Sequence, residues 1–316
     1  MTDTANAATA PGSHADPGAR RIPAAPRAGA RRARALGRYA ALLPFLAYVA
    51  YFMIVPLITV IRYAFQDPQT NAFTWSNVDA AVHGSFLHGF EQSLLLSLIA
   101  SVIPGVFGLL LAYAIFTARG RGAAALRQVV ITASGVFANF GGVPLAFLFI
   151  ASFGSTALVT GWLSDIGLNI YTMGFTLYSM SGIAVVYMYF QIPLMVLIIL
   201  PALEGLRPAW REAAENLGAR SWQYWRYVGA PVLLPSFMSC LVLLFGSALA
   251  AYATAEALTS GSIPLTPIQI GTFLNGNVLA GQQNVGYALA FGLVVIIAVL
   301  MSCYVLFQRR AAKWLR

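Results

Sequence analysis

Few charged side chains lie within the apolar parts of this sequence, and Glu256 is the clearest of them. It belongs to the segment Ala251-Tyr-Ala-Thr-Ala-Glu-Ala-Leu-Thr259, near the end of a long apolar run. A charge inside a bilayer is costly and is a functional candidate by default. As a carboxylate flanked by Tyr252 and Thr254, Glu256 could bind a cationic solute. It could equally pair with Arg62 or lie in water at the end of the run, and the sequence leaves these alternatives open.

Residues for covalent, metal or nucleotide chemistry are scarce. A Walker-type phosphate-binding loop needs a Gly-Lys-Ser/Thr step, but the only lysine is Lys313, close to the C-terminal end. Cys240 and Cys303 lie inside apolar runs, without the spacing of a disulfide or a metal site. We therefore expect a chain that is not an enzyme, has no catalytic or metal-binding residue and is not a P-loop ATPase.

The elements that must position these residues are apolar helices. Hydrophobic residues make up 59% of the chain and charged residues only 9%. Runs of about 20 apolar residues, the length needed to cross a bilayer, cover approximately residues 39–65, 92–118, 128–153, 178–202, 231–257 and 283–307. We predict an all-α polytopic membrane protein with about six transmembrane helices. Residues 66–91 form an extracytoplasmic segment in this prediction, and whether 268–280 re-enters the membrane stays open.

The net charge of +9 is distributed by position. Basic residues cluster within residues 1–38, 119–127, 207–226 and 309–316, after every second apolar run, whereas the opposite loops carry acids. This positive-inside pattern predicts that both termini and the basic loops face the cytoplasm. It argues against nucleic acid as a partner and favours contact with membrane lipid. Residues 1–38 are expected to be a disordered basic cytoplasmic tail, and 307–316 a basic cytoplasmic C-terminus.

The third run is interrupted by Asn139-Phe-Gly-Gly-Val-Pro144. Glycine and proline there free backbone groups that only protein or water can satisfy, so this helix is expected to line a cavity. The alternative for this helix is a harmless kink in a packed bundle. For a tyrosine in a bundle, the alternative to lining a passage is burial in the packed core with one hydrogen bond. The side chains that could line a polar passage are Asn139, Tyr187, Gln191, Tyr252 and Glu256.

Residues 203–230, between the fourth and fifth runs, form a charged loop. Pro208 suits the first turn of a helix, and Gly218 suits the left-handed position past its end. Ser221 is expected to cap a second short helix, and Pro231 to start the next span. A helix of about ten residues is marginal alone in water, so we expect it to dock in a groove of a partner protein, with an interfacial helix on lipid as the alternative. Its shared face would consist of Trp210, Ala213, Ala214 and Leu217.

The full spacing of this loop resembles the signature of permeases in binding-protein-dependent ABC importers. Glu212-Ala213-Ala214, three residues, Gly218, nine residues and Val228-Gly-Ala-Pro231 match the family's Glu-Ala-Ala, three residues, Gly, nine residues and Ile-x-Leu-Pro. Val228 replaces isoleucine conservatively, whereas Ala230 replaces leucine and weakens the end of the match. The resemblance covers roughly residues 92–306 and implies the type I permease fold in a bacterial plasma (inner) membrane.

The resemblance also implies a division of labour between subunits. The helix after Pro208 would be a coupling helix, seated in a cleft of a cytoplasmic ABC ATPase dimer, with Glu212 at the contact and Gly218 at the turn. ATP would be used by that partner, and this chain would bind no cofactor. Other partners would be a second permease subunit, either a similar chain or a second copy, and an extracytoplasmic solute-binding protein delivering a small molecule.

The solute is less well defined by the sequence. The long segment after the first run, Asn139-Phe-Gly-Gly and the Thr-Ala-Glu-Ala-Leu-Thr-Ser-Gly segment resemble polyamine-type permeases, while iron and phosphonate importers have similar textures. The resemblance therefore implies a spermidine- or putrescine-like solute, with iron and phosphonate as alternatives.

Two other functions remain as rivals. An ion-gradient-driven secondary transporter would need intramembrane carboxylates or histidines, yet His14, His83 and His88 lie outside the apolar runs. A membrane scaffold or sensor without transport would leave the interrupted third run and the loop signature unexplained.

Overall fold

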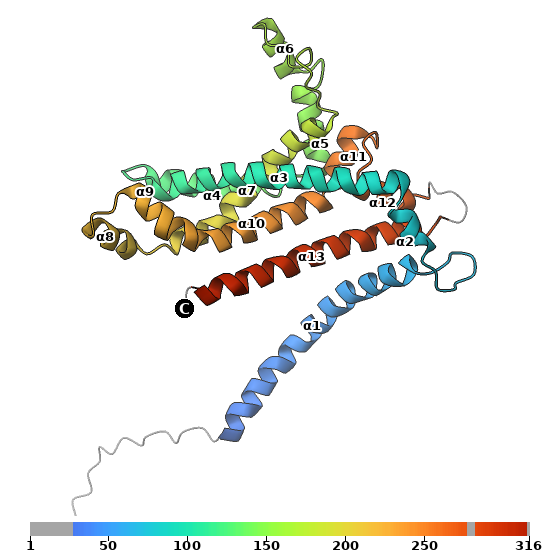
Figure 1. Cartoon of the computed structure of the whole chain (residues 1–316), viewed down its shortest axis with the longest axis horizontal. Coiled ribbons are helices and arrows are strands. Elements are labelled where there is room, and N and C mark those ends of the chain that lie inside the picture. The colour runs from blue at the N-terminus through green and yellow to red at the C-terminus, as the bar shows by residue number, and fades with distance from the viewer. Residues whose placement is uncertain (1–27, 277–281, 315–316) are drawn as a thin grey trace, which may run out of the picture. The chain divides into compact units, whose positions relative to one another are not determined.

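The computed structural model describes residues 28–276 and 282–314 (Figure 1), with side chains described from Leu42 to Leu306 outside the gap. No strand occurs within these ranges, where the extended pairing is an isolated bridge between Gln66 and Phe73. The helices are α1 (Ala28–Ala64), α2 (Ser76–Ala81), α3 (Gly84–Thr117), α4 (Ala123–Phe137), α5 (Gly142–Phe153), α6 (Leu158–Asp165), α7 (Met180–Glu204), α8 (Pro208–Asn216), α9 (Ser221–Tyr224), the π-helix η1 (Trp225–Gly229), α10 (Ala230–Ala250), α11 (Ala253–Thr259), α12 (Thr266–Leu274) and α13 (Val285–Trp314).

Six helical segments of the described chain are long and apolar enough to cross a membrane. They are Leu42–Ala64, Gly84–Thr117, Gly142–Asp165, Met180–Glu204, Ser221–Ala250 and Val285–Leu306. The predicted all-α bundle with six spans is therefore confirmed. The chain divides into two units inside α1, where the first unit ends at Pro56 and the second begins at Leu57.

Several helix boundaries differ from the predicted ones. Helix α1 begins at Ala28, so the last part of the expected disordered tail is helical; alanine and arginine are strong helix formers. Residues 1–27 of that tail lie outside the described residues. Helix α3 begins at Gly84, before the predicted start at Gln92, and Gly84 has a φ of +60° that lets the chain turn into the helix. Helix α13 continues through most of the predicted C-terminal segment.

Helices α3 and α7 pack closely because α3 presents small residues to α7. Ala100, Pro104, Gly108 and Ala112 are buried and recur every four residues on one face of α3. A Cβ atom added at Gly108 would lie 2.5 Å from Cβ of Met195 and 2.9 Å from the carbonyl oxygen of Ile192 on α7. In a bilayer, where the hydrophobic effect between helices is weak, this close packing is a main source of helix association.

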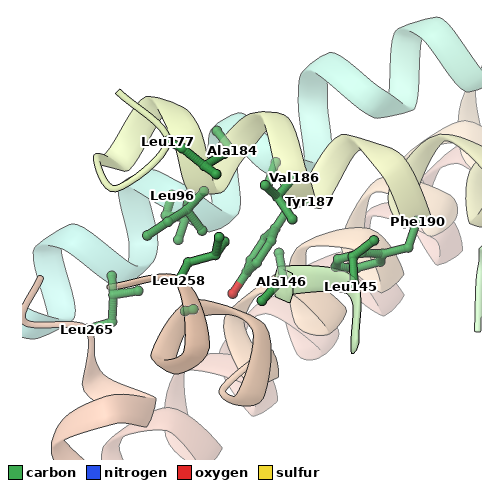
Figure 2. Packing of buried hydrophobic residues seen from close by; sticks show 14 of the residues in the cluster. Leu96, Leu145, Ala146, Leu177, Ala184, Val186, Tyr187, Phe190, Leu258 and Leu265 are labelled. Atoms are coloured by element: carbon green, nitrogen blue, oxygen red, sulfur yellow. The ribbon is translucent and has the colours of Figure 1, made fainter. Parts of the chain in front are cut away.

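The core divides into clusters along the bundle. One cluster joins α3, α5, α7 and α11 around the wholly buried Tyr187 (Figure 2), and includes Leu96, Leu145, Ile183 and Leu258. A second joins α3, α7 and α10 beside loop 203–230, through residues such as Ala112, Ile199 and Leu244. The core thus lies along the α3–α7 pair, with α10 packed against both helices.

A polar network ties distant segments together at the start of α13. The buried side chain of Asn77 donates from Nδ2 to the carbonyl oxygens of Gln66, at 2.9 Å, and Ala64, at 3.3 Å. Asn284 donates to the same Gln66 carbonyl at 2.7 Å. The residues that follow α1 are thereby hydrogen-bonded to α2 and to the residue preceding α13, which satisfies backbone groups where no helix can do so.

The glycine contacts predict opposite effects for two Gly-to-Ala substitutions. Both replacements should gain up to about 1 kcal/mol of helix propensity. Gly246→Ala, with no atom within 4 Å of the added Cβ, should keep that gain. Gly108→Ala forces α3 away from α7, and overpacking of this kind costs about 1–3 kcal/mol. Thermal unfolding of the purified chain in detergent should give a lower midpoint for Gly108→Ala than for Gly246→Ala. Equal midpoints would contradict the close packing described for α3 and α7.

Candidate coupling loop and polar cavity

Helix α8 stands on the surface of the bundle. Pro208 occupies its first turn, as predicted, and none of its residues is buried. Leu217, which directly follows the helix, is 88% exposed, and Trp210 is also exposed. The expected apolar face of Trp210, Ala213, Ala214 and Leu217 is therefore largely uncovered by the described chain. A helix of nine residues is marginal alone in water, and the described chain buries none of the residues of this one.

The charges of α8 are divided between a pair and a single carboxylate. Arg211 donates from Nε to Oε1 of Glu215 at 2.9 Å, one helical turn away. This hydrogen bond raises the pKa of the Arg211 guanidinium. Glu212 is exposed and belongs to none of the ion pairs of the described residues. Its carboxylate is available to a partner.

Gly218 ends α8 in a Schellman motif. Its φ is +76°, in the left-handed region that favours glycine. The N–H of Ala219 donates to the carbonyl of Ala214, and the N–H of Gly218 to that of Glu215, each at 2.9 Å. No atom lies within 4 Å of a Cβ added at Gly218. The requirement for glycine here is conformational and does not arise from crowding.

The second half of the loop differs from the prediction. Ser221 does not cap α9, because Arg220 is the N-cap residue and its N–H donates to Oε1 of Gln223 at 2.7 Å. Nor does Pro231 start a separate span, since α9, η1 and α10 form one continuous segment, Ser221–Ala250. Proline cannot donate a backbone hydrogen bond, and its ring clashes with the preceding turn of an α-helix. The turn that precedes Pro231 is the wider π-helix η1, which contains Val228 and ends at Gly229, and it accommodates the proline.

Side chains on both sides of the loop anchor it to the bundle. Arg127 of α4 forms an ion pair with Glu204, the last residue of α7. Tyr224 is buried, and the ring of Trp225 stands edge-on to Tyr113 of α3, with 5.1 Å between centroids. The loop is therefore fixed at its two ends and exposed at α8 between them.

A cavity of about 510 Å³ lies where two helices are interrupted. The first interruption, between α4 and α5, includes Asn139 and Gly141, and the second separates α10 from α11 at Ala251 and Tyr252. The lining residues are Ala138, Asn139, Gly141, Gly142, Phe190, Ser247, Ala250, Ala251, Tyr252, Ala253 and Thr254. None of these side chains is charged, and the polar groups are an amide, hydroxyls and backbone groups freed by the interruptions.

Hydrogen bonds of Thr254 join the two interruptions. The N–H of Gly142 donates to Oγ1 of Thr254 at 2.8 Å, and that hydroxyl donates to the carbonyl of Gly142 at 3.3 Å. Thr254 is buried on α11, while Gly142 begins α5. The expected break in the third apolar run is therefore a true separation of α4 from α5, and the membrane-length segment begins after it, as Gly142–Asp165. The second break, between α10 and α11, was not predicted, because residues 231–257 were expected to form one continuous span.

The residues predicted to line a passage fall into two groups. Asn139 and Tyr252 lie on the cavity. Tyr187 and Gln191 do not line it, because they are on the face of α7 that packs against α10, where their side chains hydrogen-bond to backbone carbonyls. Glu256 is half-buried on α11 and also lies outside the lining.

Glu256 has an unusual environment for a carboxylate. Its Oε2 atom is buried without a hydrogen-bond partner. The alternative of an ion pair with Arg62 is not realised, since no ion pair within the described ranges includes either residue.

Sequence reasoning missed Phe190 and Ser247 as lining residues. A single serine within an apolar run gives almost no signal, and Phe190 looks like any core aromatic. The usable signal was the pair of alanines after Ser247, since Ala250 and Ala251 leave room for a cavity at the end of α10.

Comparison with known proteins shows which family this chain belongs to. Residues 93–316 match the family model described as the binding-protein-dependent transport system inner membrane component. The chain is 27% identical over 201 residues to the sulfate transport system permease protein CysT of Escherichia coli, covering 63% of this chain and 67% of that one. It is 29% identical over 186 residues to the thiamine transport system permease protein ThiP of E. coli, covering 57% and 31%.

Among solved structures, the fold is similar to a chain of a bacterial alginate ABC transporter in complex with an alginate pentasaccharide-bound periplasmic protein. The TM-score is 0.72, the identity is 20%, and the alignment covers 91% of this chain and 99% of that one. The match therefore extends over most of the chain. This chain belongs to the family of binding-protein-dependent transport system inner membrane components, the multi-pass permease subunits of ABC importers, and is a transporter subunit rather than an enzyme.

Proposed function

We propose that loop 203–230 couples this permease to a separate ATPase dimer. The observation that carries the proposal is the uncovered face of α8, which ends at the left-handed Gly218 and leaves Leu217 88% exposed. An amphipathic helix with small alanines suits a protein groove, since it allows close approach. The free carboxylate of Glu212 would meet that groove, while Val228 and Pro231 shape the return into α10. ATP would be bound and hydrolysed by the partner, with no cofactor on this chain.

The orientation of the chain follows from its charge. Loop 203–230 and both termini carry the basic clusters. They would therefore lie on the cytoplasmic side of the bacterial inner membrane. The cavity lies beside Phe190, near the middle of α7, and at the end of α10 that is opposite to that loop. A solute-binding protein would then deliver its ligand on the extracytoplasmic side, as the periplasmic protein of the alginate transporter is bound to that transporter.

The cavity would form part of the translocation pathway. Interrupted helices at membrane depth are tolerated where they are buried in protein or line a water-filled cavity. Asn139, Tyr252, Ser247 and Thr254 would offer hydrogen bonds to a passing solute. A second permease, either a similar chain or another copy of this one, would complete the passage, which would open alternately to each side as the ATPase dimer closes and reopens.

The solute stays open at the level of its chemical class. The polyamine expectation gains no support from the comparisons, in which the relatives are named for sulfate and thiamine. The uncharged lining offers no carboxylate to a polycation either, since Glu256 lies outside it. We propose a small polar solute, with a sulfate-type oxyanion as the first candidate, thiamine as the second and a polyamine, iron or phosphonate as further ones.

The substrate prediction can be checked on the solute-binding protein that works with this permease. Calorimetric titration with sulfate, thiamine and spermidine should show tight binding of one of them, with sulfate expected. Binding of spermidine in preference to the other two would restore the polyamine reading. Failure of all three would exclude these solutes and direct the search to the iron and phosphonate alternatives.

The energy source separates the importer from the ion-gradient-driven rival. In proteoliposomes that contain the permease, its ATPase and its binding protein, uptake should require ATP on the loop side. It should be unaffected by ionophores that collapse proton and sodium gradients. Within the part of the chain that the structure describes, the buried Oε2 of Glu256 is the feature that favours ion coupling. Loss of uptake with ionophores, and persistence of uptake without ATP, would support that rival.

Gly218 gives a sharp test of the coupling loop. Gly218→Val should lower uptake by about tenfold or more, because a β-branched residue is a true outlier at positive φ. Membrane insertion and yield should not change, since the side chain would meet no atom. Gly218→Asn is the matched control, because asparagine tolerates the left-handed region, and should keep most of the uptake. Equal uptake by the two variants would contradict the role of this turn.

A further inference from the structure

We propose that Tyr187 and Gln191 are positioning residues for transport, which join α7 to the cavity-lining end of α10 so that movement of loop 203–230 reaches the cavity. The inference rests on the proposed function of that loop. Helix α7 runs into the loop and ends at Glu204, and the last part of the loop, α9 with η1, continues into α10 as one segment. Any displacement of the loop therefore acts first on α7 and α10.

The first link is at the point where α10 ends. The hydroxyl of Tyr187 donates a hydrogen bond to the carbonyl oxygen of Ala251 at 2.6 Å, and the tyrosine is 0% exposed. Ala251 directly follows the last residue of α10 and lines the cavity. Figure 2 shows the Tyr187 ring crossing the buried cluster with its hydroxyl oxygen directed toward α11. The hydroxyl thus supplies a donor to a carbonyl at a helix end, where intrahelical donors run out.

The second link lies one turn further along α7. Gln191 is also 0% exposed, and its Nε2 donates to the carbonyl oxygen of Leu244 at 2.8 Å. A carbonyl can only accept, so the amide nitrogen must face it. The other amide atom, Oε1, is buried without a partner. An unpaired buried acceptor lowers stability, so packing alone does not account for an amide at this position.

The two links together hold one short segment of α10. Leu244 and Ala251 lie about two helical turns apart, and Ser247 and Ala250, which line the cavity, are between them. This segment is therefore attached to α7 at both ends and follows α7 as a unit. Packed contacts and hydrogen bonds of this kind are the physical carriers of coupling between distant sites. Without the two links, the end of α10 can flex independently, and movement of the loop is lost before it reaches the cavity.

Stimulation of the ATPase by the binding protein tests this link without knowledge of the solute. The complete transporter is reconstituted in proteoliposomes, and ATP hydrolysis is measured with and without its binding protein. The variants Tyr187→Phe and Gln191→Met keep the approximate shape of each side chain. Tyr187→Phe removes the hydroxyl donor, and Gln191→Met removes the amide donor together with the unpaired Oε1. The control is Tyr189→Phe, because the Tyr189 ring contacts Phe137 and Phe149 while its hydroxyl has no hydrogen bond to the described residues.

The expected result is a selective loss of stimulation. Tyr187→Phe and Gln191→Met should reduce the stimulation by on the order of fivefold, leave the basal hydrolysis unchanged and match Tyr189→Phe in expression. The thermal unfolding midpoint of Gln191→Met should be equal to or above that of the parent, because its orphan oxygen is gone. A purely structural role would instead lower the midpoint and the basal hydrolysis together.

Two outcomes would overturn the inference. Normal stimulation in both variants means that the links do not carry the movement. A parallel decline of unfolding midpoint, basal hydrolysis and stimulation means that they serve stability alone. A parent protein that neither associates with the ATPase nor responds to the binding protein would instead refute the proposed function, and the link with it.

Discussion

Backbone polar groups that leave a helix inside an apolar bundle must find partners within the protein, and this constraint organises the structure. The chain interrupts two helices, at Asn139–Gly141 and at Ala251–Tyr252. Thr254 satisfies the first interruption through Gly142, and Tyr187 satisfies the second through the carbonyl of Ala251. Because each interruption is completed by a residue from another segment, neither can form alone. The polar cavity is the space that these paired interruptions leave open.

The opposite end of α7 and α10 follows a different constraint. There the chain leaves the apolar bundle and forms α8, whose residues are all unburied. The left-handed Gly218 reverses the chain so that α9 can continue directly into α10. In the proposed function, helices that are interrupted at one end and joined through a surface loop at the other would connect the ATPase to the passage. The permeases of ABC importers need such a connection, since they hydrolyse no ATP themselves.

The sequence predicted the class of structure well, because the length of each apolar run and the position of each charge are local properties of the chain. The six spans, the separation at Asn139–Gly141 and the Pro208 and Gly218 boundaries of α8 follow from local rules. Tyr187 and Gln191 were expected on a passage because polar side chains in an apolar helix attract attention. Which face of α7 they occupy depends on how α3 and α10 pack around it, and a single helix carries no signal for that. The continuity of α9 with α10 was missed for a related reason: Pro231 normally marks a helix start, whereas a π-turn here accommodates it.

Burial of α8 in the assembled transporter is the central claim, and chemical protection of Leu217 measures it directly. Leu217→Cys, in a chain with Cys303→Ser, is treated with a water-soluble maleimide before and after addition of the ATPase. Cys240 is buried and should not react. We expect rapid labelling of the permease alone, where Leu217 is 88% exposed, and strong protection in the assembled complex. Equal labelling in both states would contradict the seating of α8 in the partner and would leave the lipid surface as its docking site.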